Sequence, residues 1–241
     1  MTAPLDCARR SNLLFPISVR LDLGHFKANH GIMFLLPEKD CAICPRLADF
    51  RAECRAAYPD KFNAPVPSFG PDNAKVLVVG LAPGLRGANF TGRPFTGDYA
   101  GDLLYDTLLK FGFARGQYRA DPNDGLELVD ARITNAVRCL PPENKPVGAE
   151  INNCRPFLVS EIENLKNLKV IMCLGLIAHN SVLKALGARQ ADHKFIHGAV
   201  HEIGALRVID SYHCSRYNTN TGRLTTPMFE GVFKTIQTLL N

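Results

Sequence analysis

The stretch Lys75-Val-Leu-Val-Val-Gly-Leu81 is a continuous run of β-branched and apolar residues. A strand that alternates apolar and polar residues buries one face only, whereas a continuous apolar run is typical of a strand covered on both faces. Such strands lie at the centre of parallel sheets. The run therefore predicts an α/β protein, in which a central sheet has a layer of helices on each side.

The chain on either side of this run alternates between strands and helices. Further strands are predicted at 131–137, 169–174 and 206–211, with helices at 98–111, 149–164, 176–186 and from Pro227 onward. This order predicts a three-layer α/β/α sandwich with a central, mainly parallel, four-stranded sheet. Active sites of such open sheets lie beyond the carboxyl ends of the strands, so the loops after residues 81, 135 and 211 are the ones to inspect.

The 241 residues are 46% hydrophobic and 21% charged, which is ordinary for a globular protein. We expect residues 1–36 to be an N-terminal extension and residues 37–241 to form a single domain. No apolar run approaches the ~20 residues that span a bilayer, and the N-terminus lacks a signal-peptide layout. We therefore expect a cytoplasmic monomer with no membrane partner. The net charge of +5 is compatible with a nucleic-acid partner but is weak evidence for one.

Eight cysteines without a secretory signal favour metal binding or catalysis over disulfides. Cys41 and Cys44 form a C-x2-C pair in a polar segment (KDCAICPRLADF). Cys139 follows a predicted strand, and Cys154 lies early in a predicted helix. Together they predict a four-thiolate site, with buried apolar cysteines as the alternative. The count leaves zinc and a four-iron, four-sulfur cluster open. Cys173 is expected to be a core residue of its strand. Cys7 and Cys54 have no identifiable partner, with Cys54 as an alternative ligand to one of the four.

The loop after the central run is rich in glycine. It begins Gly80-Leu81-Ala82-Pro83-Gly84, where glycine lets the backbone approach a planar ligand and proline stiffens the turn. Its continuation, GANFTGRPFTGD at 87–98, contains Phe95 and places Asp98 just before a predicted helix. Position alone favours Asp98 as a helix N-cap, with a catalytic carboxylate as the alternative.

Two further loops contain polar groups that suit a base and a phosphate backbone. Asn135 offers a donor and an acceptor that match the imide edge of a base, although a turn-stabilising role fits its local sequence equally well. His213 can stabilise developing negative charge, although a lone histidine at a strand end is unremarkable. The segment SYHCSRYNTNTGR at 211–223 mixes hydroxyls, amides, tyrosines and arginines, which suit phosphates and an opened base stack.

Taken together, these segments resemble the uracil-DNA glycosylase superfamily, specifically its iron–sulfur branches. The resemblance covers residues 38–240 and rests on the four cysteines, GLAPG (80–84), TGRPFTGD (91–98), ITNAVRCLPPENKP (133–146) and SYHCSRYNTNTGRLT (211–225). It is closest to family 5 (type b), because family 4 usually has a glutamate where Leu81 stands and Asp98 matches the proposed replacement. The last motif usually reads His-Pro-Ser, so Cys214 departs from it.

The resemblance implies a glycosylase that flips uracil, and other deaminated bases, out of DNA and hydrolyses the N-glycosidic bond in base excision repair. It implies a four-iron, four-sulfur cluster rather than zinc. The implied residues are Asp98 and His213 for catalysis; Gly80, Leu81, Ala82, Gly84, Phe95 and Asn135 for the base; Ser215, Arg216, Asn218 and Arg223 for DNA; and Cys41, Cys44, Cys139 and Cys154 for the cluster.

Three alternatives compete with this hypothesis. The first is a glycosylase that prefers hypoxanthine or another damaged base. The second is a non-catalytic iron–sulfur protein that binds DNA and senses damage or redox state. The third is a zinc-stabilised structural protein.

Overall fold

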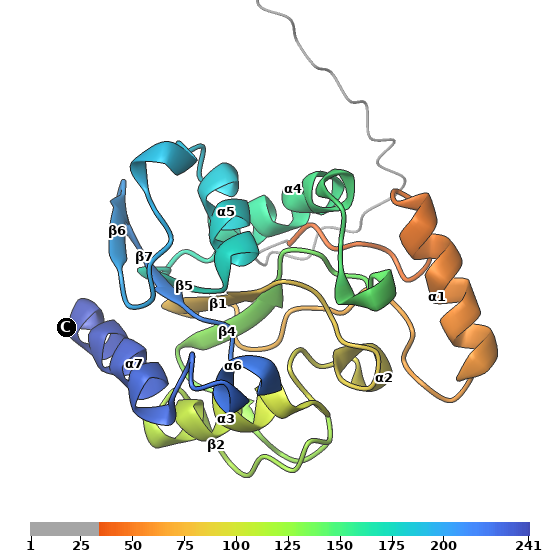
Figure 1. Ribbon diagram of the computed structural model, residues 1–241, viewed down its shortest axis with the longest axis horizontal. Coiled ribbons are helices and arrows are strands. Elements are labelled where there is room, and N and C mark those ends of the chain that lie inside the picture. The colour runs from red at the N-terminus through yellow and green to blue at the C-terminus, as the bar shows by residue number, and fades with distance from the viewer. Residues whose placement is uncertain (1–33) are drawn as a thin grey trace, which may run out of the picture. The chain divides into compact units, whose positions relative to one another are not determined.

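The central sheet has five strands in the order β4-β1-β5-β7-β6 (Figure 1). Their bounds are Val76–Gly80 for β1, Ala131–Asn135 for β4, Val170–Leu174 for β5, Val200–Ile203 for β6 and Leu206–Ser211 for β7. The computed structural model describes residues 34–241, so most of the expected extension at 1–36, and Cys7, lie outside the described residues. Strands β4, β1, β5 and β7 run parallel, as predicted.

The sheet differs from the prediction by one added strand, because β6 pairs antiparallel with β7 at the edge. The sequence signal for β6 is weak. It spans four residues that alternate between exposed and half-buried, so it lacks the continuous apolar run that marks β1 and β5. The predicted fold class, an α/β sandwich with a mainly parallel sheet, is confirmed.

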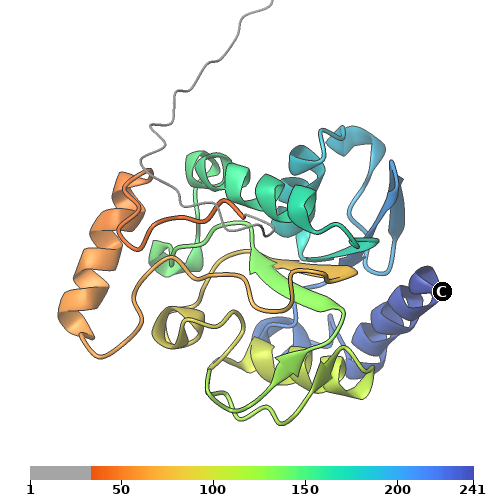
Figure 2. The same cartoon turned by 180° about the vertical axis from the view of Figure 1, so that it is seen from behind.

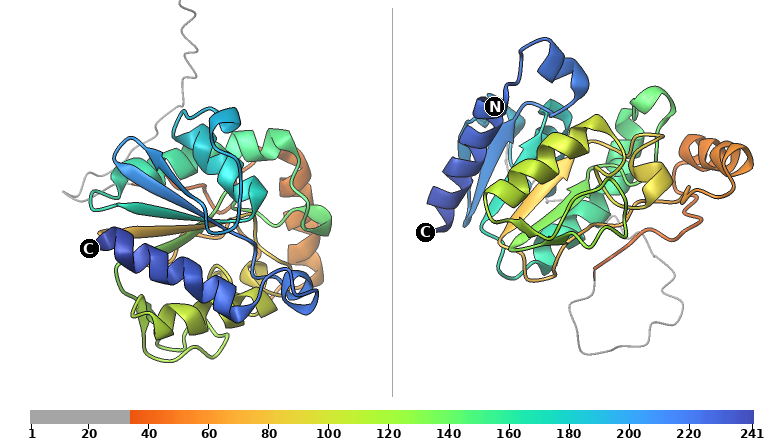
Figure 3. Two further views of the ribbon diagram at one scale, coloured as in Figure 1. Left: turned by 60° about the vertical axis from the view of Figure 1, so that its left-hand side comes forward. Right: turned by 90° about the horizontal axis from the view of Figure 1, so that it is seen from below.

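Two helices cover each face of the sheet (Figures 2 and 3). Alternate residues of β1 divide between the two cores: Val76 and Val78 pack with α3 (Tyr99–Lys110) and α7 (Thr226–Leu240). Leu77 and Val79 pack with α4 (Gly148–Asn164) and α5 (Leu176–Ala185). All five β1 residues are buried, and Cys173 of β5 is a core residue as predicted.

The parallel register brings the carboxyl ends of the strands to one edge. Gly80 of β1 pairs with Asn135 of β4, and Leu174 of β5 pairs with Ser211 of β7. The loops that leave these strands therefore begin side by side, as expected for an open parallel sheet. Helices α3, α4 and α5 were predicted to within one residue at both ends, and α7 begins one residue before the predicted Pro227.

The remaining elements are short or lie outside the sandwich. They are α1 (Pro45–Ala57), α2 (Ala88–Thr91), α6 (Arg216–Asn220), the hairpin of β2 (Ala114–Arg115) and β3 (Glu127–Leu128), and 3-10 turns at Pro142–Asn144 and Gln190–Asp192. Helix α1 was not predicted because it buries only Leu47, Arg51 and Cys54, too few for an apolar stripe. Among residues 34–241, no helix combines the length and apolar character that crossing a membrane requires.

Candidate active site

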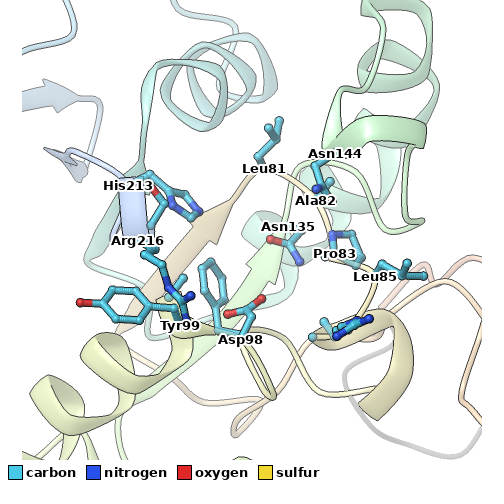
Figure 4. Close-up of a pocket in the computed structure, with 17 residues that line it drawn as sticks. Leu81, Ala82, Pro83, Leu85, Asp98, Tyr99, Asn135, Asn144, His213 and Arg216 are labelled. Atoms are coloured by element: carbon cyan, nitrogen blue, oxygen red, sulfur yellow. The ribbon is translucent and has the colours of Figure 1, made fainter. Parts of the chain in front are cut away.

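A cavity of about 530 Å³ lies at the carboxyl edge of the sheet, within the usual size of a small-molecule site (Figure 4). Nine residues predicted for the site line it: Leu81, Ala82, Gly84, Phe95, Asp98, Asn135, His213, Ser215 and Arg216. Arg86, Tyr99 and Asn144 also line it and were not predicted as site residues. Their polar or aromatic character beside glycine- and proline-rich loops was the only available signal.

Gly80 lies beneath the cavity, where it makes room for two of the lining side chains. A Cβ atom at this position would stand 2.4 Å from Asn135 Oδ1 and 2.6 Å from Phe95 Cζ. Only glycine therefore lets both side chains lie against the end of β1. Asn135 is 4% exposed, and its Oδ1 has no hydrogen-bond partner among the described residues. A buried acceptor of this kind is costly unless a ligand satisfies it.

Phe95 is held in an unusual backbone conformation at the base of the cavity. Its φ is +53°, in the left-handed region that bulky residues rarely adopt. Two tyrosines hold the segment: the Tyr118 hydroxyl donates to Phe95 O at 3.2 Å, and the Tyr105 hydroxyl donates to Pro94 O at 2.6 Å. Such strain persists only where the surroundings fix it, and it clusters at functional sites.

A buried ion pair supports the same loop from below. The Arg93 guanidinium donates to both Asp124 oxygens at 2.8 Å and lies over the rings of Phe69, Tyr105 and Tyr118. Hydrogen bonds from Arg93 hold the pKa of Asp124 well below its usual range. Sequence analysis did not identify this pair, although it anchors the TGRPFTGD segment to the loop that follows β2.

Asp98 is both a helix cap and part of the cavity lining. It is the N-cap of α3, as position predicted, because its Oδ1 accepts from Gly101 N at 3.1 Å. Its Oδ2 faces the loop after β1, where a Cβ on Gly87 would stand only 2.4 Å away. Burial raises the pKa of Asp98, and hydrogen bonds from the Gly101 and Ala100 amides partly offset that rise. The carboxylate therefore caps the helix and lines the cavity at once.

His213 and Phe95 both line the cavity, and their ring centroids are 5.9 Å apart. The protein packed around the half-buried imidazole desolvates it, and this lowers the pKa of His213 to about 4. The ring is therefore neutral at pH 7 and offers one N–H donor. Its backbone is fixed by Asn218, whose amide donates to His213 O at 2.8 Å.

The side chains expected to contact DNA after His213 have partners within the protein. Ser215 caps α6, and Asn218 turns inward to His213, so both side chains have intramolecular partners. Arg216 lies over the Tyr99 ring at 5.1 Å, and Arg223 lies over Tyr212 at 4.7 Å without lining the cavity. Tyr217 has the most exposed large apolar side chain of the described residues, at 72%.

The four predicted ligand cysteines gather in a second place, between α1 and α4. Cys139 and Cys154 pack with Cys44 in one apolar cluster, and Cys41 lies near enough for its charge to raise the pKa of both buried thiols. Burial is the larger cause and raises the pKa of Cys139 to about 12 and of Cys154 to about 11.

The spacing of the four sulfurs bears on which metal centre they fit. Within residues 34–241, no three of these sulfurs lie within 4.8 Å of one another. A single zinc ion with Zn–S bonds of ~2.3 Å needs all four sulfurs within about 3.8 Å of one another. In a four-iron cluster each thiolate binds a different iron, which suits a wider set. Cys54 is buried in α1 and is not part of the cluster of Cys44, Cys139 and Cys154.

Comparison with known proteins gives one family. The model of the uracil DNA glycosylase superfamily matches residues 67–237. The chain is 43% identical over 195 residues to the type-5 uracil-DNA glycosylase of Thermus thermophilus, covering 78% of this chain and 89% of that protein. It is 40% identical over 199 residues to the type-5 uracil-DNA glycosylase of Pyrobaculum aerophilum, covering 81% of this chain and 87% of that protein. The type-4 uracil-DNA glycosylase of Archaeoglobus fulgidus is 31% identical over 153 residues, covering 61% of this chain and 69% of that protein.

Proposed function

We propose that this chain, which belongs to the uracil DNA glycosylase superfamily, cleaves uracil from DNA and so begins base excision repair. The observation that carries the proposal is the cavity in which the unpartnered Oδ1 of Asn135, the Phe95 ring and the neutral His213 imidazole converge. These three groups match the parts of a uracil ring, which has an imide edge, a flat face and a carbonyl that gains charge when the base leaves.

Base recognition rests on Asn135 and Phe95. The N3–H of uracil is a donor for the buried Asn135 Oδ1, and the amide nitrogen of the same side chain donates to uracil O4. Cytosine presents an acceptor at N3, so it would leave the Asn135 acceptor unsatisfied. The Phe95 ring stacks on the base, and the glycine at position 80 keeps both side chains in reach. Leu81 adds apolar surface without selecting a hydrogen-bonding group.

Cleavage moves the bonding electron pair from the glycosidic bond to uracil N1, leaving a cationic sugar that takes up water. His213 donates a hydrogen bond to uracil O2 as negative charge develops there. A preorganised donor of this kind contributes about 3–4 kcal/mol. Asp98, when ionised, stabilises the sugar cation and accepts the proton of the attacking water. Its carboxylate lines the cavity and accepts a hydrogen bond from the Gly101 amide, which suits that role.

The nucleotide reaches this cavity by leaving the duplex, at a cost of a few kcal/mol. Tyr217 is our candidate for the side chain that fills the gap, because it is 72% exposed and follows Arg216 at the rim. Arg216 supplies charge for the phosphate on the same side. Ser215 and Asn218 support this turn through its backbone, which gives them an indirect part in DNA binding.

Cys41, Cys44, Cys139 and Cys154 would hold a four-iron, four-sulfur cluster, in which each thiolate binds a different iron; no three of their sulfurs lie within 4.8 Å of one another among the described residues, which suits that wider set. The cluster's role is structural. It joins the segment that leads into α1 to Cys139 after β4, and so steadies the 3-10 turn at Pro142–Asn144, which contributes Asn144 to the cavity. A broad absorbance near ~400 nm together with iron in elemental analysis tests this assignment, and zinc without iron would contradict it.

The activity is tested with a labelled oligonucleotide that carries one uracil, followed by alkaline cleavage of abasic sites. We expect single-turnover cleavage of U·G substrate by the wild type and a loss of about 100-fold or more in His213→Ala. Binding without cleavage would instead support a non-catalytic DNA-binding protein. Parallel U·A, single-stranded, hypoxanthine and thymine substrates define the base range, and preferred cleavage of hypoxanthine would replace uracil as the main substrate.

A further inference from the structure

Behind the strand that leads to His213, a second group of polar side chains is buried away from the cavity. Asp210 of β7 is fully buried and lies 2.7 Å from His179 Nδ1 of α5 and 2.9 Å from His201 Nε2 of β6. His179 is 1% exposed. None of the three lines the active-site cavity, and neither the predicted roles nor the proposed function uses them.

The hydrogen bonds of His179 show that a cation belongs in this group. Its Nε2 lies 2.9 Å from the carbonyl oxygen of His193. A carbonyl only accepts, so Nε2 carries the proton and Nδ1 of the neutral ring carries a lone pair. That lone pair faces Asp210 Oδ1 at 2.7 Å. Two acceptors in contact require a second proton or a metal ion between them.

Three features of the geometry favour a metal ion. First, a histidine that binds metal commonly donates its other N–H to a backbone carbonyl, as His179 does to His193. Second, the ligand atoms of His179, His201 and Asp210 all lie within 4.8 Å of one another. Third, with Zn–N bonds of about 2.05 Å, two imidazoles on one tetrahedral ion have ring centroids about 5.2 Å apart. The observed separation of His179 and His201 is 5.3 Å.

We propose that His179 Nδ1, His201 Nε2 and the Asp210 carboxylate bind one zinc-type divalent cation. Two imidazoles and one carboxylate are a donor set that zinc accepts, whereas calcium and magnesium prefer oxygen ligands throughout. Tetrahedral donors on zinc stand about 3.4 Å apart. Asp210 therefore has to retreat by about half an ångström from its present contacts when the ion enters.

The site joins three elements, α5, β6 and β7, and Asp210 precedes His213 by three residues. An ion that binds only the folded state at about 100 times its Kd raises the folded-to-unfolded ratio about 100-fold. Zinc is thus expected to stabilise the edge of the sheet that carries His213. This inference does not rest on the proposed glycosylase activity, because its readouts are metal binding and stability.

The test compares His201→Gln with His197→Gln in the full-length protein, after EDTA treatment and removal of the EDTA. His197 belongs to the same segment but stacks on Tyr212 and is not one of the three ligands. Both variants keep every cysteine, so zinc bound by thiols appears equally in both. Calorimetric titration with zinc should lose about one equivalent in His201→Gln only. Zinc should raise the Tm of the wild type and of His197→Gln but not that of His201→Gln.

Equal zinc stoichiometry and equal Tm shifts in the wild type and His201→Gln would overturn the proposal and leave a proton as the cation. Nitrogen-15 NMR of the histidine side chains keeps the test independent of whether a variant folds. In the wild-type protein, zinc should replace the proton on His179 Nδ1 while the proton on Nε2 remains. A His179 ring that stays doubly protonated with zinc in excess would also overturn the proposal.

Discussion

Replacing Gly80 by alanine tests the core of the proposed site, because one methyl group displaces two side chains at once. The new Cβ would lie 2.4 Å from Asn135 Oδ1 and 2.6 Å from Phe95 Cζ. Ordinary contacts begin near 3.4 Å, so each side chain must move by about 1 Å. A misplacement of about 1 Å in an active site lowers the rate about 100-fold.

Other parts of the molecule give little room for relief. Strand β1 is paired with β4 on one side and β5 on the other, so its backbone is fixed. Phe95 is restrained by the hydroxyls of Tyr105 and Tyr118, which bond the backbone on either side of it. We therefore expect Asn135 to swing away from the base. Overpacking of this kind also lowers the free energy of unfolding by about 1–3 kcal/mol.

The assay is single-turnover cleavage of a U·G oligonucleotide, with thermal unfolding measured on the same preparations. Gly148→Ala is the matched control, since a Cβ there meets nothing within 4 Å. It should cleave at the wild-type rate. If Gly80→Ala acts through Asn135, adding it to Asn135→Ala should lower the rate little further. A Gly80→Ala protein that folds and cleaves within about threefold of wild type would refute the reasoning.

Three further predictions address charge. Asp98→Asn should keep the helix cap within about 0.5 kcal/mol but slow cleavage about 100-fold or more; an unchanged rate in single-turnover assays would reduce Asp98 to a cap. Burial lowers the pKa of His213 to about 4 and raises that of Asp98. The cleavage rate should therefore show no inflection from His213 near pH ~6.5 and should fall on the acid side as Asp98 and His213 take up protons; an inflection near ~6.5 that His213→Gln abolishes would contradict this assignment. Glu161 is fully buried between two arginines, so Glu161→Gln should lower the free energy of unfolding by about 3 kcal/mol in denaturant titration. The control Glu163→Gln, at an exposed position, should change the free energy of unfolding by less than about 0.5 kcal/mol. Equal losses in the two variants would contradict the stabilising role of the buried Glu161.

The fold was largely predictable because burial on both faces leaves a plain signal. Strands β1 and β5 are buried throughout their length and appear in the sequence as uninterrupted apolar stretches, whereas the equally buried β4 reads ARITN and was identified by its place in the strand–helix alternation. Strand β6 and helix α1 gave no such signal. Strand β6 has one neighbour and exposed side chains, and α1 is attached in part by the ion pair between Arg46 and Glu150. Polar contacts between distant segments leave no periodicity in the sequence.

The same distinction applies to the candidate site. Its lining residues could be named because they follow strand ends, where the topology predicts a binding edge. The supporting residues could not. Arg93 and Asp124 are 31 positions apart, and neither their spacing nor their surroundings in the sequence indicates that they meet. The left-handed φ of Phe95 depends on such contacts, since no glycine occupies that position. A sequence thus indicates where reacting groups gather better than it indicates what holds them there.

Cys214 illustrates how one such support replaces another. The related motif usually has proline between the histidine and serine, and proline restricts the loop through its own φ. Here the fully buried Cys214 thiol donates to Ala100 O at 3.3 Å, in the first turn of the helix that Asp98 caps. Burial, and then the nearby Asp98 charge, raise the pKa of this thiol, so it stays protonated and remains a donor. The contact joins the His213 loop directly to the start of α3. A local backbone constraint is thereby exchanged for a tertiary one, which ties the position of His213 to that of Asp98.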